Sequence, residues 1–217
     1  MKLSLVAAVV LIIAGAALFF LPALNQSLFI YINSLFPHQL FWTAITTIGE
    51  GSVAGCIFYL LLRKNNDALL KGAIAAVAGL IVANGFKYLF AVPRPEHTAS
   101  FDQPFHLLVE PMSVTSFSMP SGHTIAAFLL GTLLFHFLKL NLLGKIALGI
   151  LLAAIGISRI ALGVHWPADV LAGAGLGIFV ASVSAGLPIH INNKKGIRVV
   201  HLLYLLFVVA LVHKYVV

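Results

Sequence analysis

The feature that most constrains this chain is a series of separate apolar runs, each about as long as a membrane-spanning helix. A helix needs about 20 apolar residues to cross the hydrocarbon layer of a bilayer, which is about 30 Å thick. Six such runs form the predicted core and a seventh follows them: 3–21, 43–62, 72–91, 122–138, 146–163, 168–187 and 199–217. The sequence therefore predicts an all-α, polytopic membrane helix bundle with a six-helix core and an additional C-terminal hydrophobic helix.

The composition excludes a water-soluble globular domain. Hydrophobic residues make up 61% of the 217 residues and charged residues only 9%, with a mean hydropathy of +1.07, whereas soluble domains carry about 25% charged residues. The formal net charge is +7, but the basic residues lie in short connections and are not interleaved with aromatic residues, so we expect no nucleic-acid partner. We interpret 1–217 as one integral membrane domain that contacts membrane lipids.

Two segments are expected to lie outside the spanning helices. The segment 25–42 is apolar but is broken by Asn33, Pro37 and His38, which predicts a position along the membrane interface. The segment 96–119 holds three acids, two histidines and two prolines and is the longest predicted soluble loop.

The basic residues outside the central motifs fall on one side of the predicted membrane. The opposite side receives only Lys214, whereas the basic side receives Lys2, Arg63, Lys64, Lys71, Lys139, Lys145, Lys194, Lys195 and Arg198. Because lysine and arginine are enriched in cytoplasmic loops, the N-terminus is predicted to be cytoplasmic. In a bacterial-type inner membrane the loop 96–119 would then face the periplasm or exterior.

Six ionisable residues lie in or beside apolar runs, where a charge is costly and marks a functional candidate. The topology predicts that all six lie near the outward boundary: Lys87, Arg94, His123, Arg159, His165 and Asp169. Each has a structural alternative, because lysine can snorkel and arginine can pair with lipid phosphates. Six such residues at one depth nevertheless favour a shared site.

The basic members of this set suit phosphate chemistry. Lys87, Arg94 and Arg159 supply three positive charges and the bidentate geometry of arginine. The break at Pro93 is expected to turn Arg94 back toward the pocket that contains Lys87, because proline ends a helix.

A helix N-terminus is predicted beside these cations. Ser121 is expected to cap the helix that begins near Gly122, whose free amides and positive dipole end would face an anion. Gly122 would let that backbone approach the anion closely.

The remaining residues suggest a nucleophile and an acid. His165 and Asp169 are four residues apart and would share a helix face, so Asp169 would accept from one ring nitrogen and leave the other free to attack phosphorus. Pro167 is consistent with a helix that starts just after His165. His123 would then protonate the leaving oxygen. No spacing typical of metal ligands occurs, so the sequence predicts no metal and no cofactor.

Three segments resemble the three signature motifs of the type-2 phosphatidic acid phosphatase family, which also includes the vanadium haloperoxidases. They are Lys-Tyr-Leu-Phe-Ala-Val-Pro-Arg-Pro at 87–95, Pro-Ser-Gly-His at 120–123, and Ser-Arg at 158–159 followed by His165 and Asp169. Together they define a motif core over 87–169.

The resemblance implies a metal-independent lipid phosphatase with a six-helix core. The family's phosphate-binding positions match Lys87, Arg94, Ser121, Gly122 and Arg159. Its acid matches His123, and its nucleophile and orienting carboxylate match His165 and Asp169. The C-terminal hydrophobic segment 199–217 departs from the family pattern, so the side on which the chain ends stays open.

The sequence leaves three functions open. The leading one is hydrolysis of a lipid phosphate monoester or diphosphate at the outer membrane face through a phosphohistidine, on polyprenyl diphosphate, phosphatidylglycerol phosphate, phosphatidate or a lipid A phosphate. The second is phosphotransfer from one lipid to another at the same site. The third is transport of an anion. The predicted position of the cations argues against it, because they lie at one boundary of the membrane and not at the bilayer centre. The particular lipid and the oligomeric state are open as well.

The other polar residues receive simpler interpretations. Interface or packing roles are expected for His136, His190, His201 and His213. Solvation is favoured over headgroup contact for the residues of the outer loop, namely Glu96, His97, Asp102, His106 and Glu110.

Overall fold

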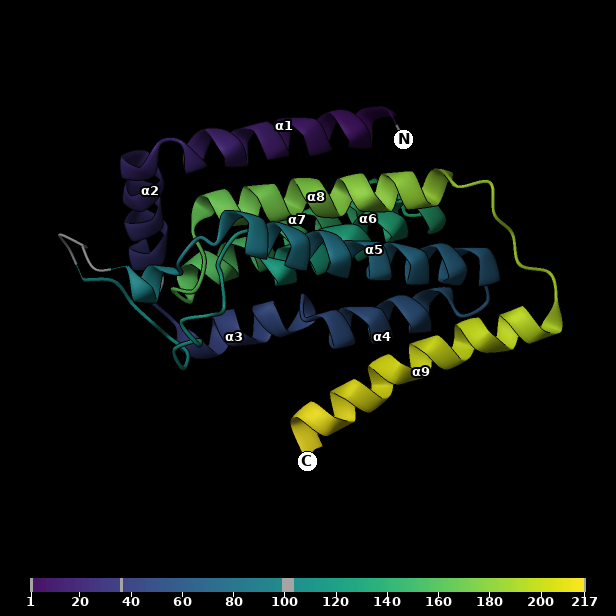
Figure 1. The fold of residues 1–217 in the computed structure, drawn as a ribbon. Helices are drawn as coiled ribbons and strands as arrows, with labels where there is room; N and C mark the ends of the chain where they lie inside the picture. Colours follow the sequence, from purple (N-terminus) through teal and green to yellow (C-terminus); the bar gives the residue numbers. More distant parts are fainter. Residues whose placement is uncertain (1, 36, 99–103, 217) are drawn as a thin grey trace.

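The computed structural model describes residues 2–35, 37–98 and 104–216, which form a bundle of α-helices (Figure 1). The helices are α1 (Lys2–Phe19), α2 (Pro22–Leu35), α3 (Gln39–Ile48), α4 (Gly51–Leu62), α5 (Asn66–Phe90), α6 (Gly122–Phe137), α7 (Leu142–Ala161), α8 (Pro167–Gly186) and α9 (Lys194–Val216), with a short 3₁₀ helix η1 (Pro95–His97). Strands are absent from these described ranges. The predicted all-α bundle with an additional C-terminal helix is therefore confirmed.

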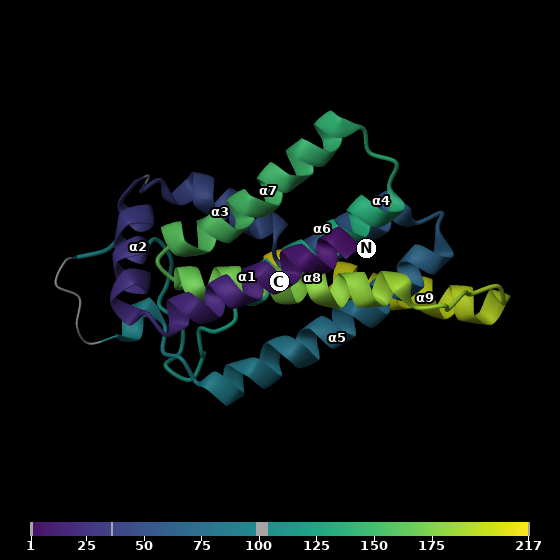
Figure 2. The ribbon, with the colours of Figure 1, turned by 90° about the horizontal axis from the view of Figure 1, so that it is seen from above.

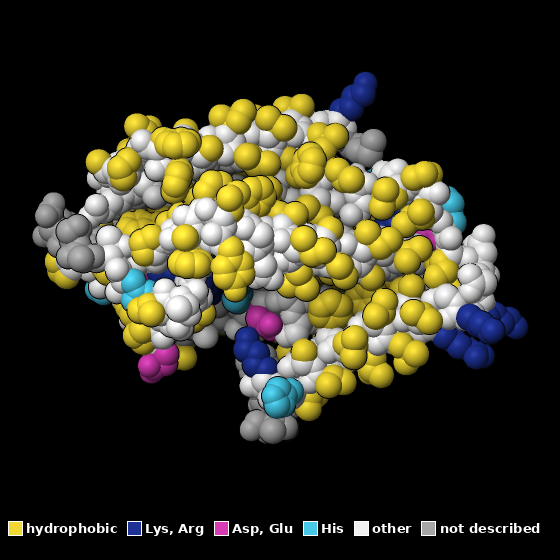
Figure 3. Space-filling view, in the orientation of Figure 1, with side chains coloured by type: hydrophobic (Ala, Val, Ile, Leu, Met, Phe, Trp, Pro, Cys, Tyr) yellow, Lys and Arg dark blue, Asp and Glu magenta, His cyan; other side chains and the backbone are white. Residues whose placement is uncertain are grey.

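The apolar helices are long enough for a multi-pass membrane protein. Five of the described helices meet the length and composition of a span: α1, α5, α7, α8 and α9. The pair α3 and α4 makes a sixth if it is counted as one span, and α6 is a shorter apolar helix. Hydrophobic side chains cover most of the face in Figure 3, as expected for a surface in contact with lipid.

The predicted span 43–62 differs from the structure because it is not one straight helix. Helices α3 and α4 meet at an angle of 54°. Gly49 ends α3, and Glu50 begins α4 by accepting a hydrogen bond from the amide of Ser52 at 3.4 Å. Local capping at this pair of residues therefore bends the span, and it leaves the Glu50 carboxylate inside the bundle.

Helix α2 runs across the end of the bundle, whereas the other helices run roughly along it (Figures 1 and 2). The break predicted at Asn33 does not occur, since α2 continues through it to Leu35. The Asn33 amide is buried and donates to the carbonyls of His106, Ile160 and Ala161 at 2.9–3.2 Å, while its oxygen accepts from the His106 amide at 2.7 Å. Asn33 therefore ties α2 to the outer loop and to the end of α7.

Helix α5 begins at Asn66, six residues before the predicted start at 72. The side chain of Asn65 accepts from the amide of Ala68 at 3.0 Å and caps the helix. Lys71 thus lies inside the helix and not in a connection. It is buried, and its Nζ donates to the carbonyl of Ala185 at 3.0 Å, which compensates the cost of burying the charge.

Helix α8 packs against α1, α5, α6 and α7 in the middle of the bundle. Glycines bring its backbone close to two neighbours. A Cβ on Gly175 would lie 2.7 Å from the carbonyl oxygen of Ala8 on α1, and a Cβ on Gly177 would lie 2.6 Å from that of Ile125 on α6. Small residues allow this kind of close contact between membrane helices.

The two ends of the bundle differ in charge. In Figure 3 exposed Lys and Arg side chains project from the end that holds the N-terminus and the connection between α8 and α9. The connection after α5 and the first turns of α6 and α8 lie at the opposite end, beside α2 (Figure 1). The candidate site residues occupy this second end, as the following section describes.

Candidate active site

The candidate site forms where α5 and α7 end and α6 and α8 begin. The last turn of α5 carries Lys87, and Arg94 follows it; α6 begins with His123 beside Gly122, and α7 ends near Arg159. His165 lies just before α8. The six ionisable residues predicted to share one depth do converge, because His165 interacts electrostatically with Lys87, Arg94, His123 and Arg159 and contacts Asp169 directly.

The contact between His165 and Asp169 is made at the start of α8. His165 Nδ1 lies 3.2 Å from Asp169 Oδ2, and the two residues are 2% and 1% exposed. The start of a helix just after His165, expected from Pro167, is confirmed, since α8 begins at Pro167. The predicted shared helix face is wrong, because His165 itself precedes α8. The contact forms instead because the Asp169 carboxylate turns back and also accepts the amide of Trp166 at 2.8 Å.

Two contacts assign the proton on the His165 ring. A carboxylate only accepts hydrogen bonds, so Nδ1 carries the proton that Asp169 accepts. Nε2 lies 3.4 Å from Arg94 Nη1, which only donates. Burial, together with the cations Arg94 and Arg159, lowers the pKa of His165 well below its usual range. The free protein therefore holds a neutral imidazole whose Nε2 lone pair faces Arg94.

Arg94 is held rigidly beside this nitrogen. It is 3% exposed, with Nε donating to the Ser116 carbonyl at 2.7 Å and Nη1 to the Val164 carbonyl at 2.8 Å. Nη2 donates to the Ser116 hydroxyl at 3.2 Å. Arg94 therefore contacts the loop before α6 and the connection between α7 and α8, and it also interacts electrostatically with Lys87, as expected for a chain that turns back after Pro93.

Arg159 presents a free donor to the same region. Its Nη1 donates to the hydroxyl of Thr46 on α3 at 2.7 Å, whereas its buried Nε has no hydrogen-bond partner in the described part of the chain. An unpaired buried donor is costly. An anion bound beside Arg159 would satisfy it.

The start of α6 differs from the prediction for Ser121. Ser121 occupies the N-cap position, but its side chain does not cap the helix. Its buried Oγ instead accepts a hydrogen bond from the hydroxyl of Thr124 at 2.9 Å. A Cβ on Gly122 would meet nothing within 4 Å, so there is open space beside Gly122 at the start of α6. The first amides of α6 and the helix dipole are available to an anion.

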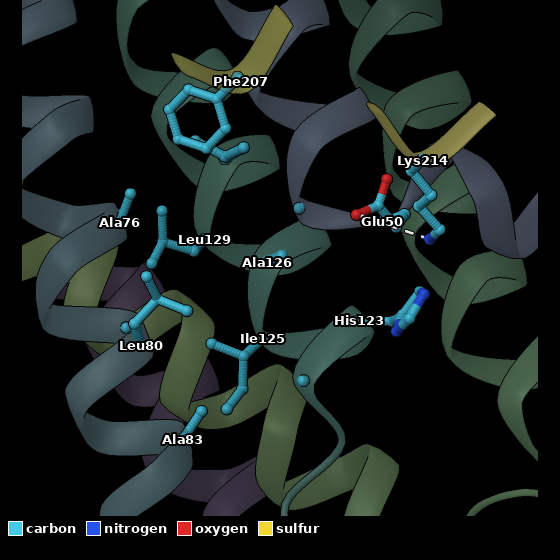
Figure 4. A pocket seen from close by; sticks show the side chains of 14 residues that line it. Glu50, Ala76, Leu80, Ala83, His123, Ile125, Ala126, Leu129, Phe207 and Lys214 are labelled. Atoms are coloured by element: carbon cyan, nitrogen blue, oxygen red, sulfur yellow. Dashed lines mark ion pairs between the residues drawn. The ribbon is translucent and has the colours of Figure 1, made fainter. Parts of the chain in front are cut away.

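His123 lies half-buried on the first turn of α6 and lines a cavity of about 360 Å³ together with Gly122 (Figure 4). In the figure its ring lies near the carboxylate of Glu50, which caps the start of α4, and the amine of Lys214 on α9. Its position between the cations and an apolar cavity suits a group that exchanges a proton with a bound lipid headgroup.

Sequence reasoning missed Ser118, which is fully buried. Its hydroxyl donates to Asp169 Oδ2 and lies 3.3 Å from His165 Nδ1, while its amide donates to the Val92 carbonyl at 2.8 Å. Ser118 therefore holds the Asp169 carboxylate in place. Its position two residues before the segment 120–123 was the only available signal.

Thr46 was missed as well, since nothing in the sequence relates α3 to Arg159.

Two loop residues expected to be solvated have structural contacts instead. His97 Nε2 lies 2.8 Å from the Met112 carbonyl, and Glu96 accepts from the Met112 amide at 3.2 Å. Asp102 lies outside the described residues.

Two of the four histidines expected to have interface or packing roles, His190 and His201, make side-chain contacts. His190 lies 2.7 Å from Asp67 and His201 lies 3.0 Å from the Tyr59 hydroxyl. These contacts support the predicted roles of His190 and His201, which lie at the opposite end of the bundle from the candidate site.

The fold is thus a membrane helix bundle that carries a cluster of charged residues at one end. This combination can be compared with known protein families. The model of the PAP2 superfamily matches residues 68–193, which is more than half of the chain. The chain belongs to this superfamily, which confirms the resemblance inferred from its motifs.

Several curated relatives match a similar part of the chain. The bacitracin transport permease protein BcrC of Bacillus licheniformis is 36% identical over 131 residues, which cover 58% of this chain and 60% of that protein. An undecaprenyl-diphosphatase of Sulfolobus acidocaldarius is 32% identical over 126 residues, covering 58% and 57%. Phosphatidylglycerophosphatase B of Bacillus subtilis is 39% identical over 87 residues, covering 36% and 43%. The chain thus spans 43–60% of the length of these relatives.

Two solved structures share the fold. LpxE of Aquifex aeolicus aligns with a TM-score of 0.61 and 33% identity over 74% of this chain and 94% of that one. A transmembrane PAP2-type phosphatidylglycerolphosphate phosphatase of Bacillus subtilis aligns with a TM-score of 0.65 over 86% and 96%. Its identity of 23% supports the fold alone.

Proposed function

We propose that the protein is an integral membrane phosphatase that hydrolyses a lipid phosphate monoester or diphosphate through a phosphohistidine. The observation that carries this proposal is the geometry of His165. Its Nδ1 is bound by Asp169 at 3.2 Å, and its Nε2 faces the fixed guanidinium of Arg94 at 3.4 Å. A phosphoryl group that binds to Arg94 would therefore lie directly beside a neutral, oriented nucleophile.

In the first step Nε2 of His165 attacks phosphorus, and the bond from phosphorus to the leaving oxygen breaks. His123 gives its proton to that oxygen, so the alcohol or lipid phosphate departs without a full alkoxide charge. Asp169 stabilises the positive ring that forms. Three basic side chains, Lys87, Arg94 and Arg159, neutralise the charge on the peripheral oxygens.

In the second step a water molecule attacks the phosphohistidine. His123 accepts a proton from this water, the bond between phosphorus and Nε2 breaks, and inorganic phosphate leaves. The first amides of α6, beside Ser121 and Gly122, would bind a phosphate oxygen in both steps.

A lipid substrate follows from the position of the site. The cluster lies at the end of a membrane bundle, and His123 borders an apolar cavity. Relatives with the names undecaprenyl-diphosphatase and phosphatidylglycerophosphatase B support a lipid phosphate as the substrate class. Polyprenyl diphosphate, phosphatidylglycerol phosphate, phosphatidate and lipid A phosphates all present the required phosphoryl group.

Two other functions compete with hydrolysis. A lipid acceptor could replace water in the second step, which would make the protein a phosphotransferase. The name of the Bacillus licheniformis relative suggests transport, but Lys87, Arg94 and Arg159 lie at helix ends, whereas a transporter needs its anion site near the middle of the membrane. Anion flux without phosphate release would favour transport, and phosphate appearing on an added lipid acceptor would favour phosphotransfer.

Phosphate release from a panel of these lipids by the purified protein in detergent tests the proposal. Because three fixed cations perform the charge neutralisation that divalent ions perform in other phosphatases, activity should survive EDTA. Vanadate should inhibit it, since vanadate adopts the five-coordinate geometry of phosphoryl transfer. Loss of activity in EDTA that one specific metal restores would show that the metal-independent mechanism is wrong.

A second experiment tests the orientation, which rests on the basic residues at the opposite end of the bundle. Val114 is 72% exposed in the outer loop, and Asn192 is exposed at the basic end. On a Cys56→Ala background, Val114→Cys should react with an impermeant thiol reagent in spheroplasts, while Asn192→Cys should react only after the membrane is broken. The reverse pattern would place the site on the cytoplasmic face.

A further inference from the structure

The cavity beside His123 continues from the candidate site into the apolar part of the bundle (Figure 4). Its lining runs along α6 from Gly122 and His123 to Leu129 and Leu130. The seven residue steps from His123 to Leu130 correspond to about 10 Å of helix. The cavity is therefore a largely apolar space that extends along α6 from Gly122 and His123.

Small residues on α5 keep this space open. Ala76, Gly79 and Ala83 face it at intervals of three and four residues, which is one face of a helix. A Cβ on Gly79 would lie 2.8 Å from Leu129 Cδ1. A larger side chain on this face of α5 would therefore fill the cavity.

The outer wall of the cavity comes from α9, which the family resemblance does not account for. Phe207 lines the cavity, and Tyr204 lies on the same face of α9 in the buried core. Two glycines receive these rings. A Cβ on Gly55 would lie 2.7 Å from Phe207 Cδ1, and one on Gly72 would lie 2.5 Å from the Tyr204 hydroxyl. The opposite face of α9 is exposed and apolar, for example at Val209, as expected for contact with lipid.

An ion pair holds the end of this wall beside the site. Lys214 Nζ lies 3.8 Å from Glu50 Oε1, and the Glu50 side chain is 17% exposed. Both residues line the cavity together with His123 (Figure 4). The bend between α3 and α4 brings Glu50 to this position, so the break in that span and the end of α9 meet at the mouth of the cavity.

We propose that this cavity binds the hydrocarbon chain of the substrate lipid and that α9 forms its outer wall, held at the site end by Lys214 and Glu50. The occupant follows from continuity, because His123 and Gly122 belong both to the cavity and to the phosphate end. A lipid whose phosphate lies at Arg94 would extend its chain along α6 between apolar walls. This inference rests on the proposed phosphatase function and makes Phe207 a specificity-determining residue.

The cavity is tested by filling it. Ala126 lines it one turn beyond His123, and Val77 is 59% exposed on the outside of α5. Ala126→Phe should lower kcat/KM for a long-chain lipid phosphate by about tenfold or more, because about two methylene groups lose their buried contacts. Hydrolysis of the water-soluble p-nitrophenyl phosphate should be nearly unchanged. Val77→Phe serves as the matched control and should affect neither substrate.

The wall is tested by opening it. Phe207→Ala should raise KM for the lipid several-fold and leave kcat on p-nitrophenyl phosphate unchanged, whereas Val209→Ala on the lipid-facing side of α9 should leave both parameters unchanged. Phe207→Leu should recover most of the affinity. If Phe207→Ala has no effect, or lowers the rates with both substrates equally, α9 is not the wall of a chain-binding site.

The two proposals fail in different ways. If the wild-type protein releases phosphate from neither the lipid nor p-nitrophenyl phosphate, the phosphatase function is wrong. If it hydrolyses both, and Ala126→Phe affects them equally or not at all, the phosphatase function stands and the chain-binding cavity is wrong.

Discussion

Substitution of His165 by alanine is expected to abolish both turnover and any trapped phosphoenzyme, whatever the leaving group. The reason is geometric, because Nε2 of His165 is the unprotonated nitrogen that faces the guanidinium of Arg94. Without the imidazole no covalent intermediate can form. The measurement is rapid quenching with a ³²P-labelled lipid phosphate, followed by analysis of acid-labile protein phosphate. A phosphoenzyme that still forms in His165→Ala would show that another residue is the nucleophile.

His123→Ala is the control that separates the two histidines by role. It should slow hydrolysis of a lipid phosphate much more than that of an aryl phosphate, because a leaving group of low pKa needs little protonation. Phosphoenzyme formation from the aryl phosphate should therefore survive. Equal losses on both substrates would show that His123 does not act as the acid.

Asp169→Asn is expected to reduce the rate by about 10⁴-fold, the loss seen when the orienting aspartate of a serine triad is changed in the same way. Asp169 Oδ2 receives hydrogen bonds from His165 Nδ1, from the Trp166 amide and from Ser118. An asparagine of the same shape keeps the packing but removes the charge that stabilises the imidazolium. It can also present its amide to Nδ1, which would select the wrong tautomer.

The measurement is the rate of phosphoenzyme formation in a single turnover, together with the thermal stability of the purified variant. Ser118→Ala provides a graded comparison, because it removes one hydrogen bond from the carboxylate and keeps the charge, and we expect a much smaller loss. If Asp169→Asn retains nearly full activity at normal stability, Asp169 does not orient the nucleophile.

The sequence was sufficient to predict the class of fold and the convergence of the charged residues. Ionisable side chains in apolar runs are so costly that their positions are informative, and Lys87, Arg94 and Arg159 do meet His165 at one end of the bundle. The short spacing between His165 and Asp169 predicted their contact, and Pro167 predicted that the helix would start just after His165.

The supporting residues could not be predicted, because each acts over a long separation in the chain. Thr46 holds Arg159 from 113 residues away, and Asn33 reaches Ile160 from 127 residues away. Nothing in a single sequence indicates which polar side chain will meet which helix end. The capping role predicted for Ser121 was wrong for a local reason, since the hydroxyl of Thr124, three residues along the chain, donates to the Ser121 oxygen.

The glycine contacts of α8 bear on how a protein of this kind could change its substrate over evolutionary time. A Cβ on Gly173 would lie 2.9 Å from the Ser121 carbonyl oxygen, so main-chain contact sets the spacing between α8 and α6 and with it the separation of His165 from His123. The side chains that line the cavity, such as Ala126 and Phe207, play no part in this spacing. If the cavity binds the lipid chain as proposed, substitutions in its lining would change which lipid fits without moving the two histidines.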